Sequence, residues 1–201
     1  MPAEKRDLAA LLDSQLVDMA RDAKPGDLAA FDQLVERHQG HVRANCRYMT
    51  GNPQDAEDLA QDVFVKAYFA LGSFQGRSGF KTWVRRIKAN RCLSHLESMG
   101  RRSYVDIDDP VVARGSEMEV AADADQWLDG EDLRRDVGAV LDMLNETLRV
   151  PLVMRDMDQM TYEEIAEALD LGLSAVKMRI KRARETFREA WTRRFTTGAT
   201  P

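Results

Sequence analysis

Cysteine is scarce in this sequence, with 2 among 201 residues. Two cysteines cannot form the disulfide framework that stabilises small secreted proteins, so the composition indicates a reducing compartment and a cytoplasmic protein. The sequence also lacks any apolar run near the roughly 20 residues that a membrane-spanning helix needs. Its acidic, amphipathic N-terminus has no apolar stretch of the kind found in secretory signals. We therefore expect no membrane insertion.

Proline is uncommon too, with 6 residues, and few segments alternate between apolar and polar residues as half-buried strands do. Apolar residues instead recur three and four positions apart, which predicts an all-α protein. Because 44% of residues are hydrophobic and 31% are charged, the chain resembles a folded protein rather than a disordered one.

The net charge of −5 argues against a protein that coats nucleic acid along its whole length, but the charge is unevenly distributed. Residues 73–102 contain eight basic residues and one acid, and residues 174–194 contain eight basic residues and two acids. Between them, residues 103–133 contain ten acids and one arginine. Two basic blocks separated by an acidic one suggest that the protein contacts a polyanion at two places.

The pattern of helices predicts two small helical domains joined by a flexible acidic linker. The domain expected at residues 1–97 comprises a segment before Pro25 and helices over residues 27–49, 55–71 and 80–97, with Asp27 as an N-cap. Residues 98–130 lack helical periodicity and form the expected linker, because so long a structureless stretch is unusual inside one domain. A second helical domain is expected at residues 131–195, and a disordered tail at 196–201.

The second domain contains the most informative segment. One helix is expected around residues 137–144 and another over residues 150–157, with Pro151 in its first turn. Thr161-x-x-Glu164 then forms a capping box, and residues 170–173 form a short glycine-bearing turn. Ser174 is expected to cap the following helix, whose inward stripe is Val176, Ile180, Ala183 and Phe187.

The opposite face of that last helix is basic. It carries Ser174, Lys177, Met178, Lys181 and Arg182. A capped helix, a tight turn and a basic helix indicate a helix-turn-helix, whose second helix enters the major groove of DNA. The alternative is that these charges merely solvate a surface helix, but the capping box, the turn and the apolar stripe together favour DNA binding.

The first basic block differs because aromatic residues are interspersed among its cations. Phe74, Arg77, Lys81, Trp83, Arg85 and Arg86 form this set. Bases can stack on aromatic rings while nearby cations contact the phosphates, so this combination is typical of a binding site for single-stranded DNA. Phe80 is expected in the core instead, Arg85 and Arg86 are expected to face outward, and the loop at residues 74–81 has nothing obvious to bury.

An acidic edge precedes this block on the helix at residues 55–71. It consists of Asp55, Glu57, Asp58, Gln61 and Asp62. Such an edge could meet a basic partner, or it could serve only to complement the helix dipole and aid solubility.

Three segments together resemble the extracytoplasmic-function (ECF) family of sigma factors of bacterial RNA polymerase, group 4 of the sigma-70 superfamily. They are DAEDLAQDVFVKAY, FQGRSGFKTWVRRIKAN and YEEIAEALDLGLSAVKMRIKRARE. The resemblance implies that the first docks on the β′ clamp helices of core RNA polymerase. It implies that the second, including Asn90, melts and reads the −10 element, and that the third reads the −35 element of promoter DNA.

The resemblance further implies a stress-responsive transcription initiation factor with no catalytic residues and no cofactor, held by an anti-sigma factor. In the family the linker threads toward the polymerase active centre. Its acids, including Asp106, Asp108 and Asp109, could therefore mimic RNA there, or the linker could be a passive tether.

Two other functions fit parts of the sequence. A metal-dependent enzyme or sensor could use His38, His41, Cys46, Cys92 and His95, some of which are spaced to share a helix face. A stand-alone helix-turn-helix regulator with an N-terminal ligand domain would bind DNA without polymerase, whereas a sigma factor would bind DNA weakly until polymerase is present.

Overall fold

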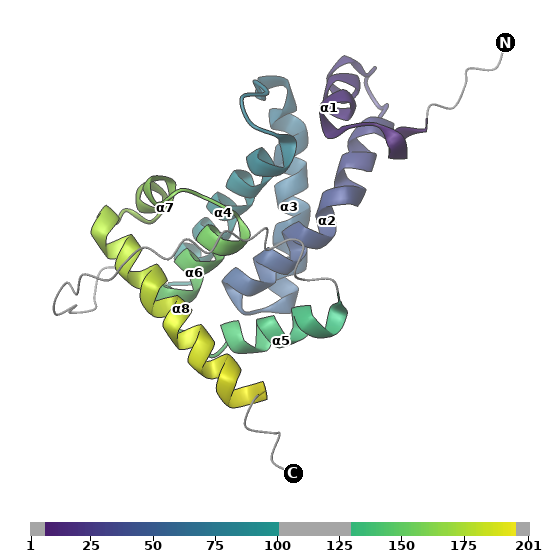
Figure 1. Cartoon of the computed structure of the whole chain (residues 1–201). Coiled ribbons are helices and arrows are strands. Elements are labelled where there is room, and N and C mark those ends of the chain that lie inside the picture. The colour runs from purple at the N-terminus through teal and green to yellow at the C-terminus, as the bar shows by residue number, and fades with distance from the viewer. Residues whose placement is uncertain (1–6, 101–129, 196–201) are drawn as a thin grey trace. The chain divides into compact units, whose positions relative to one another are not determined.

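The computed structural model describes residues 7–100 and 130–195, and every regular element in these ranges is a helix (Figure 1). The chain divides into two compact units, Met1–Ser94 and His95–Pro201. The expected all-α class with two small helical domains is thereby confirmed. The hypotheses about the acidic linker and the C-terminal tail concern residues 101–129 and 196–201, outside the described residues.

The first unit contains two short 3-10 helices and four α-helices. In chain order they are η1 (Leu8–Ala10), α1 (Asp13–Asp22), α2 (Ala29–Thr50), α3 (Pro53–Ala70), η2 (Leu71–Ser73) and α4 (Phe80–Ser98), the last running four residues past the unit's boundary. Each α-helix contributes an apolar stripe to one core, since Leu16, Leu34, Val63 and Val84 are at most 1% exposed. The core thus fixes α1 and α4, the two helices that carry the site described below.

The junction between α2 and α3 follows directly from three consecutive residues, Gly51, Asn52 and Pro53. Gly51 adopts a left-handed conformation with φ of 73°, and its N–H donates to the carbonyl of Arg47 at 2.9 Å. The Asn52 side chain then accepts a hydrogen bond from the N–H of Gln54 at 2.9 Å, and Pro53 occupies the first helical position. The chain therefore ends one helix and begins the next without a loop.

Two details of the first unit differ from the sequence prediction. Asp27 is not the N-cap of α2, because the helix begins at Ala29 and Leu28 holds the cap position. The Asp27 carboxylate still accepts from the N–H of Ala29 at 3.3 Å, so it stabilises the approach to the helix. Val65, expected to pack inward, is 54% exposed because it lies on the outer face of α3.

The second unit contains four α-helices and one wide π turn. They are α5 (Glu131–Leu141), α6 (Glu146–Leu152), the π turn η3 (Val153–Met157), α7 (Tyr162–Leu169) and α8 (Leu173–Phe195). Figure 1 shows α8 as the long yellow helix, and α5, α6 and α7 each contact it. Val176, Ile180 and Ala183 form the buried stripe of α8, as predicted, while Phe187 is half-buried.

Pro151 lies in the middle of a helix rather than in its first turn. The helix α6 begins five residues earlier, where the Asn145 side chain accepts a hydrogen bond from the N–H of Leu148 at 3.1 Å. Pro151 cannot donate a backbone hydrogen bond to the preceding turn. The helix widens soon afterwards into η3, where the N–H of Asp158 donates to Val153, five residues back, at 3.0 Å.

The turn between α7 and α8 depends on an aspartate and not on its glycine. Asp170 has the left-handed conformation, with φ of 53°, which aspartate tolerates better than most residues. Gly172 precedes α8, and its carbonyl accepts from the N–H of Val176 at 3.1 Å. Ser174, predicted as the cap, is already the second residue of the helix.

The capping box of α7 is confirmed and can be tested. The Thr161 hydroxyl accepts from the N–H of Glu164 at 3.1 Å, and the Glu164 carboxylate accepts from the N–H of Thr161 at 2.9 Å. Thr161→Ala should lower the free energy of unfolding of the second unit by about 0.5–2 kcal/mol, measured by urea denaturation. Thr192→Ala, at an exposed position within α8, should change it by less than about 0.5 kcal/mol. Equal effects of the two changes would contradict the assigned role of the cap.

Candidate nucleic-acid interface

The outer face of α8 carries its cations opposite the buried stripe. Lys177, Lys181 and Arg182 are exposed, as is Ser174, and Met178 is half-buried. Val176 and Ile180 hold the other side of the helix in the core, so the cations cannot rotate inward. A rigid helix that presents several cations to solvent can contact the phosphates and base edges of a DNA groove.

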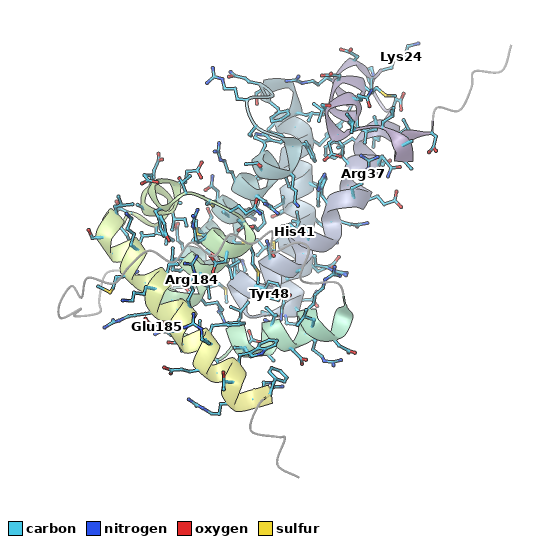
Figure 2. The ribbon with its side chains drawn as sticks, viewed as in Figure 1. Lys24, Arg37, His41, Tyr48, Arg184 and Glu185 are labelled. Atoms are coloured by element: carbon cyan, nitrogen blue, oxygen red, sulfur yellow. The ribbon has the colours of Figure 1, made fainter. Side chains whose placement is uncertain are left out.

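Two other residues of this unit were not identified from the sequence. The Tyr162 ring lies between the Arg155 guanidinium, 4.6 Å from its centroid, and the Lys177 ammonium at 5.6 Å. The ring therefore orients Lys177 through cation–π attraction. Glu185 is exposed one turn beyond Lys181 and limits the basic surface (Figure 2).

Arg184 serves the fold and not the basic surface. Its guanidinium donates two hydrogen bonds to the carboxylate of Asp156, at 3.0 and 2.5 Å (Figure 2). These bonds raise the pKa of Arg184 above its ordinary value. The pair ties α8 to η3.

In the first unit, the loop after η2 packs its aromatic residue inward. The Phe74 ring is 7% exposed and lies 4.8 Å from the Trp83 ring and 6.4 Å from the Phe80 ring, measured between centroids. The expectation that this loop has nothing to bury was therefore wrong, whereas the core position of Phe80 is confirmed. The Arg21 guanidinium lies 5.8 Å from the Phe74 centroid, and its Nε donates to the carbonyl of Leu71 at 3.1 Å.

Phe74 and Phe80 of this cluster form one wall of a cavity of about 350 Å³ between α1 and the loop. The residues that line it are Asp13, Ser14, Val17, Phe74, Gly76, Arg77, Ser78, Gly79, Phe80 and Lys81. Gly76 has a φ of 67°, a left-handed backbone conformation that favours glycine. The cavity thus combines an aromatic wall, loop backbone groups, two cations and one carboxylate.

The carboxylate of Asp13 is held by two side chains of α2. Arg37 donates to its Oδ1 at 2.9 Å, and His38 Nε2 lies 2.7 Å from its Oδ2. Arg37, which is labelled in Figure 2, also donates to the carbonyls of Leu8 and Ala9, at 3.1 and 2.8 Å. One arginine therefore fixes both the N-terminal segment and the floor of the cavity.

The network shifts the pKa values of both Asp13 and His38. Burial raises the pKa of Asp13, but the hydrogen bonds and charges of Arg37 and His38 outweigh burial, so the pKa lies below its ordinary value. Burial lowers the pKa of His38 more than Asp13 raises it, and Lys81 and His41 lower it further. The carboxylate is therefore ionised and the imidazole neutral above about pH 7, with Nε2–H donating to Asp13.

The remaining candidate residues of the first basic block divide into two groups. Arg77, Arg86 and Asn90 are exposed, and Lys81 and Trp83 are half-exposed. Arg85, expected on the outer face with Arg86, lies instead against α2, where its Nε donates to His41 Nε2 at 3.2 Å. The exposed surface around the cavity therefore has one cation fewer than the sequence suggested, because Arg85 is buried.

The acidic edge of α3 is exposed at Glu57, Asp58 and Gln61, whereas Asp55 and Asp62 are half-buried. Asp62 accepts two hydrogen bonds from Arg91 of α4, at 2.9 and 2.5 Å, and Glu57 lies 3.5 Å from Arg43. Val65 and Phe69 continue the line of Asp58 and Asp62 along the same face, and the Phe69 side chain is 81% exposed. On the outer face of α3, an acidic patch is therefore continuous with an apolar patch.

The sulfur atoms of Cys46 and Cys92 approach to 3.6 Å, and both residues are buried. Among residues 7–100 and 130–195, no group of three histidine, cysteine or acidic residues has a geometry that could hold a metal ion. The described residues thus give the metal hypothesis no support.

No helix in the described ranges is long and apolar enough to cross a membrane.

Two sequence families match the chain. Residues 34–102 match the family described as Sigma-70 region 2, and residues 134–187 match Sigma-70, region 4. The first match covers the cavity loop, α3 and α4. The second covers α7 and the basic part of α8.

Whole-length relatives agree with these matches. The chain is 35% identical over 181 residues to the ECF RNA polymerase sigma-E factor of Escherichia coli strain K12, covering 87% of this chain and 94% of the relative. It is 34% identical over 182 residues to the RNA polymerase sigma-H factor of Pseudomonas aeruginosa, covering 89% and 93%. A solved structure of CnrH in complex with the cytosolic domain of CnrY matches with a TM-score of 0.52 and 26% identity, covering 88% and 95%.

The lowered pKa of His38 predicts how stability depends on pH. An unfolded chain binds a proton at the ordinary histidine pKa of 6.5, whereas the folded state resists protonation, so this stability is present above pH 6.5 and is lost as pH falls below it. The free energy of unfolding, from urea titrations at pH 7.5 and 5.5, should fall less in His38→Gln than in the parent. Glutamine can still donate to Asp13 but does not titrate. Equal pH dependence in the two proteins would contradict this role.

Proposed function

Because the chain belongs to the ECF family of RNA polymerase sigma factors, we propose that three of its surfaces divide the work of promoter recognition. The protein directs core polymerase to promoters and carries out no catalysis itself. Polymerase and −10 binding are assigned to residues 1–97, and −35 binding to residues 131–195. The observation that carries this assignment is the exposed row Lys177, Lys181 and Arg182, fixed outward by the buried stripe of α8.

The polymerase contact is assigned to the outer face of α3. Asp58 and Gln61 can meet cations of the β′ clamp helices, while Val65 and Phe69 supply apolar area that is otherwise exposed. Apolar surface at the centre of a contact and charges at its rim are usual in protein interfaces. Asp55, Glu57 and Asp62 complete the acidic side, with Glu57 and Asp62 also held by Arg43 and Arg91.

The −10 contact is assigned to the cavity and the exposed residues near it. Arg77, Lys81, Arg86 and Asn90 can follow the strand, and one extruded base can enter the cavity. Extruding a base costs a few kcal/mol, and stacking on an aromatic ring returns about 1–3 kcal/mol. Phe74 and Phe80 are the rings that line the cavity. Trp83 is a half-exposed ring packed against Phe74, and Arg85 holds α4 against α2.

Regulation is assigned to a protein partner that covers these surfaces. The related protein CnrH was solved with the cytosolic domain of CnrY bound to it, and an anti-sigma factor would hold this chain in the same manner. The chain then acts in the cytoplasm, where polymerase and DNA are found.

The polymerase assignment predicts the effect of one charge reversal. Asp58→Lys should weaken binding to core RNA polymerase by roughly tenfold, because it removes an attraction and adds a repulsion at a desolvated rim. Binding can be measured by fluorescence anisotropy of labelled protein titrated with core enzyme. Glu36→Lys, an equal charge reversal at an exposed site of α2, is the matched control. A parent-like affinity for Asp58→Lys would remove this face from the interface.

The −35 assignment predicts both a polymerase requirement and a mutant effect. Holoenzyme should shift a promoter duplex in a gel, whereas the chain alone should bind it weakly. Lys181→Ala should lower holoenzyme binding by about 1–3 kcal/mol if Lys181 meets a base edge, with the loss depending on that base, or uniformly if it meets phosphate. Arg188→Ala, an exposed cation further along α8, should have little effect. Strong sequence-specific binding without polymerase would favour a stand-alone regulator instead.

A further inference from the structure

We propose that the Asp13 carboxylate selects the base that enters the cavity, favouring bases with an exocyclic amino group and disfavouring thymine. This inference rests on the proposed capture of an extruded base. It goes further by naming a residue of α1, far in sequence from the −10 segment, as a determinant of which base is accepted.

The composition of the cavity makes Asp13 conspicuous. Among the ten residues that line it, Asp13 is the one acid, and it faces a DNA strand whose phosphates would repel it. Arg77 and Lys81 are the residues of the lining suited to phosphate. A carboxylate in such a place suits the base itself, because Asp and Glu accept hydrogen bonds from exocyclic amino groups of bases.

The carboxylate is held ready for this role. Arg37 and His38 each occupy one of its oxygens, and 30% of its side chain remains exposed. Each carboxylate oxygen can accept two hydrogen bonds, so both retain capacity. An ionised carboxylate only accepts, and it therefore repels the O4 carbonyl of thymine while it binds the amino group of adenine, cytosine or guanine.

The alternative is that Asp13 only braces α1 against Arg37 and His38. A bracing role affects every promoter alike, because a loosened cavity holds all bases poorly. A selecting role changes the ranking of bases at one position. The two roles are separated by measuring discrimination and not overall affinity.

The test uses holoenzyme and promoter duplexes that carry a pre-melted −10 region, with each non-template position substituted in turn by all four bases. At the captured position the parent should bind thymine about tenfold or more weakly than adenine, as expected for losing a hydrogen bond to a charged group. Purine, which is adenine without its amino group, should show a similar loss at that position and little loss elsewhere. This arm uses the parent protein, so it does not depend on how a variant folds.

The variant arm compares Asp13→Asn with Ser14→Ala, the neighbouring residue of the same lining. Asp13→Asn should bind adenine and thymine within about twofold of each other, because an amide can donate to O4. Ser14→Ala should keep the parental ranking.

The outcomes separate the inference from the function on which it rests. If an abasic nucleotide at every position binds as well as a base, the proposed capture itself fails, and if no position shows base dependence, the selecting role of Asp13 is overturned. If one position does, yet purine binds there as well as adenine, capture stands and the role of Asp13 is overturned. A uniform loss in Asp13→Asn with parental ranking would likewise reduce Asp13 to a brace.

Discussion

The hydrogen-bonded group of Asp13, Arg37 and His38 is the constraint on which the first unit depends. It joins the first turn of α1 to the middle of α2, and through Arg37 it also holds the carbonyls of Leu8 and Ala9. The core residues of α1 alone would allow that short helix to slide along α2, because apolar contacts have little directionality. Charged hydrogen bonds fix one position, in which Asp13, Ser14 and Val17 of α1 line the cavity beside the loop.

The sequence was a good guide wherever one local rule determined the outcome. The spacing of Val176, Ile180 and Ala183 predicted the buried stripe of α8 and hence its exposed cations, because 3.6 residues per turn leave no other arrangement. The capping box at Thr161 was equally readable, since its two side chains and two backbone N–H groups satisfy one another. These rules act over a few residues and need no knowledge of the fold.

Prediction failed where a distant neighbour decided the outcome. Phe74 was assigned to a free loop because its burial depends on Trp83 and Phe80, which only the fold brings to it. Arg85 is buried because its guanidinium donates a hydrogen bond to His41 of α2. Asp13 and Tyr162 were overlooked for the same reason, as neither belongs to a recognisable motif and each acquires its role from residues of another element. The turn predicted at residues 170–173 is present, and its left-handed residue is Asp170.

Phe69 has a consequence for the life of the unbound protein. A phenylalanine that is 81% exposed forgoes about 1.5–3 kcal/mol of burial that a partner could recover. Val65 lies one turn away on the same face of α3, so Val65 and Phe69 together form an exposed apolar strip that can bind another apolar surface. Unbound copies are consequently prone to self-association and to capture by chaperones and proteases.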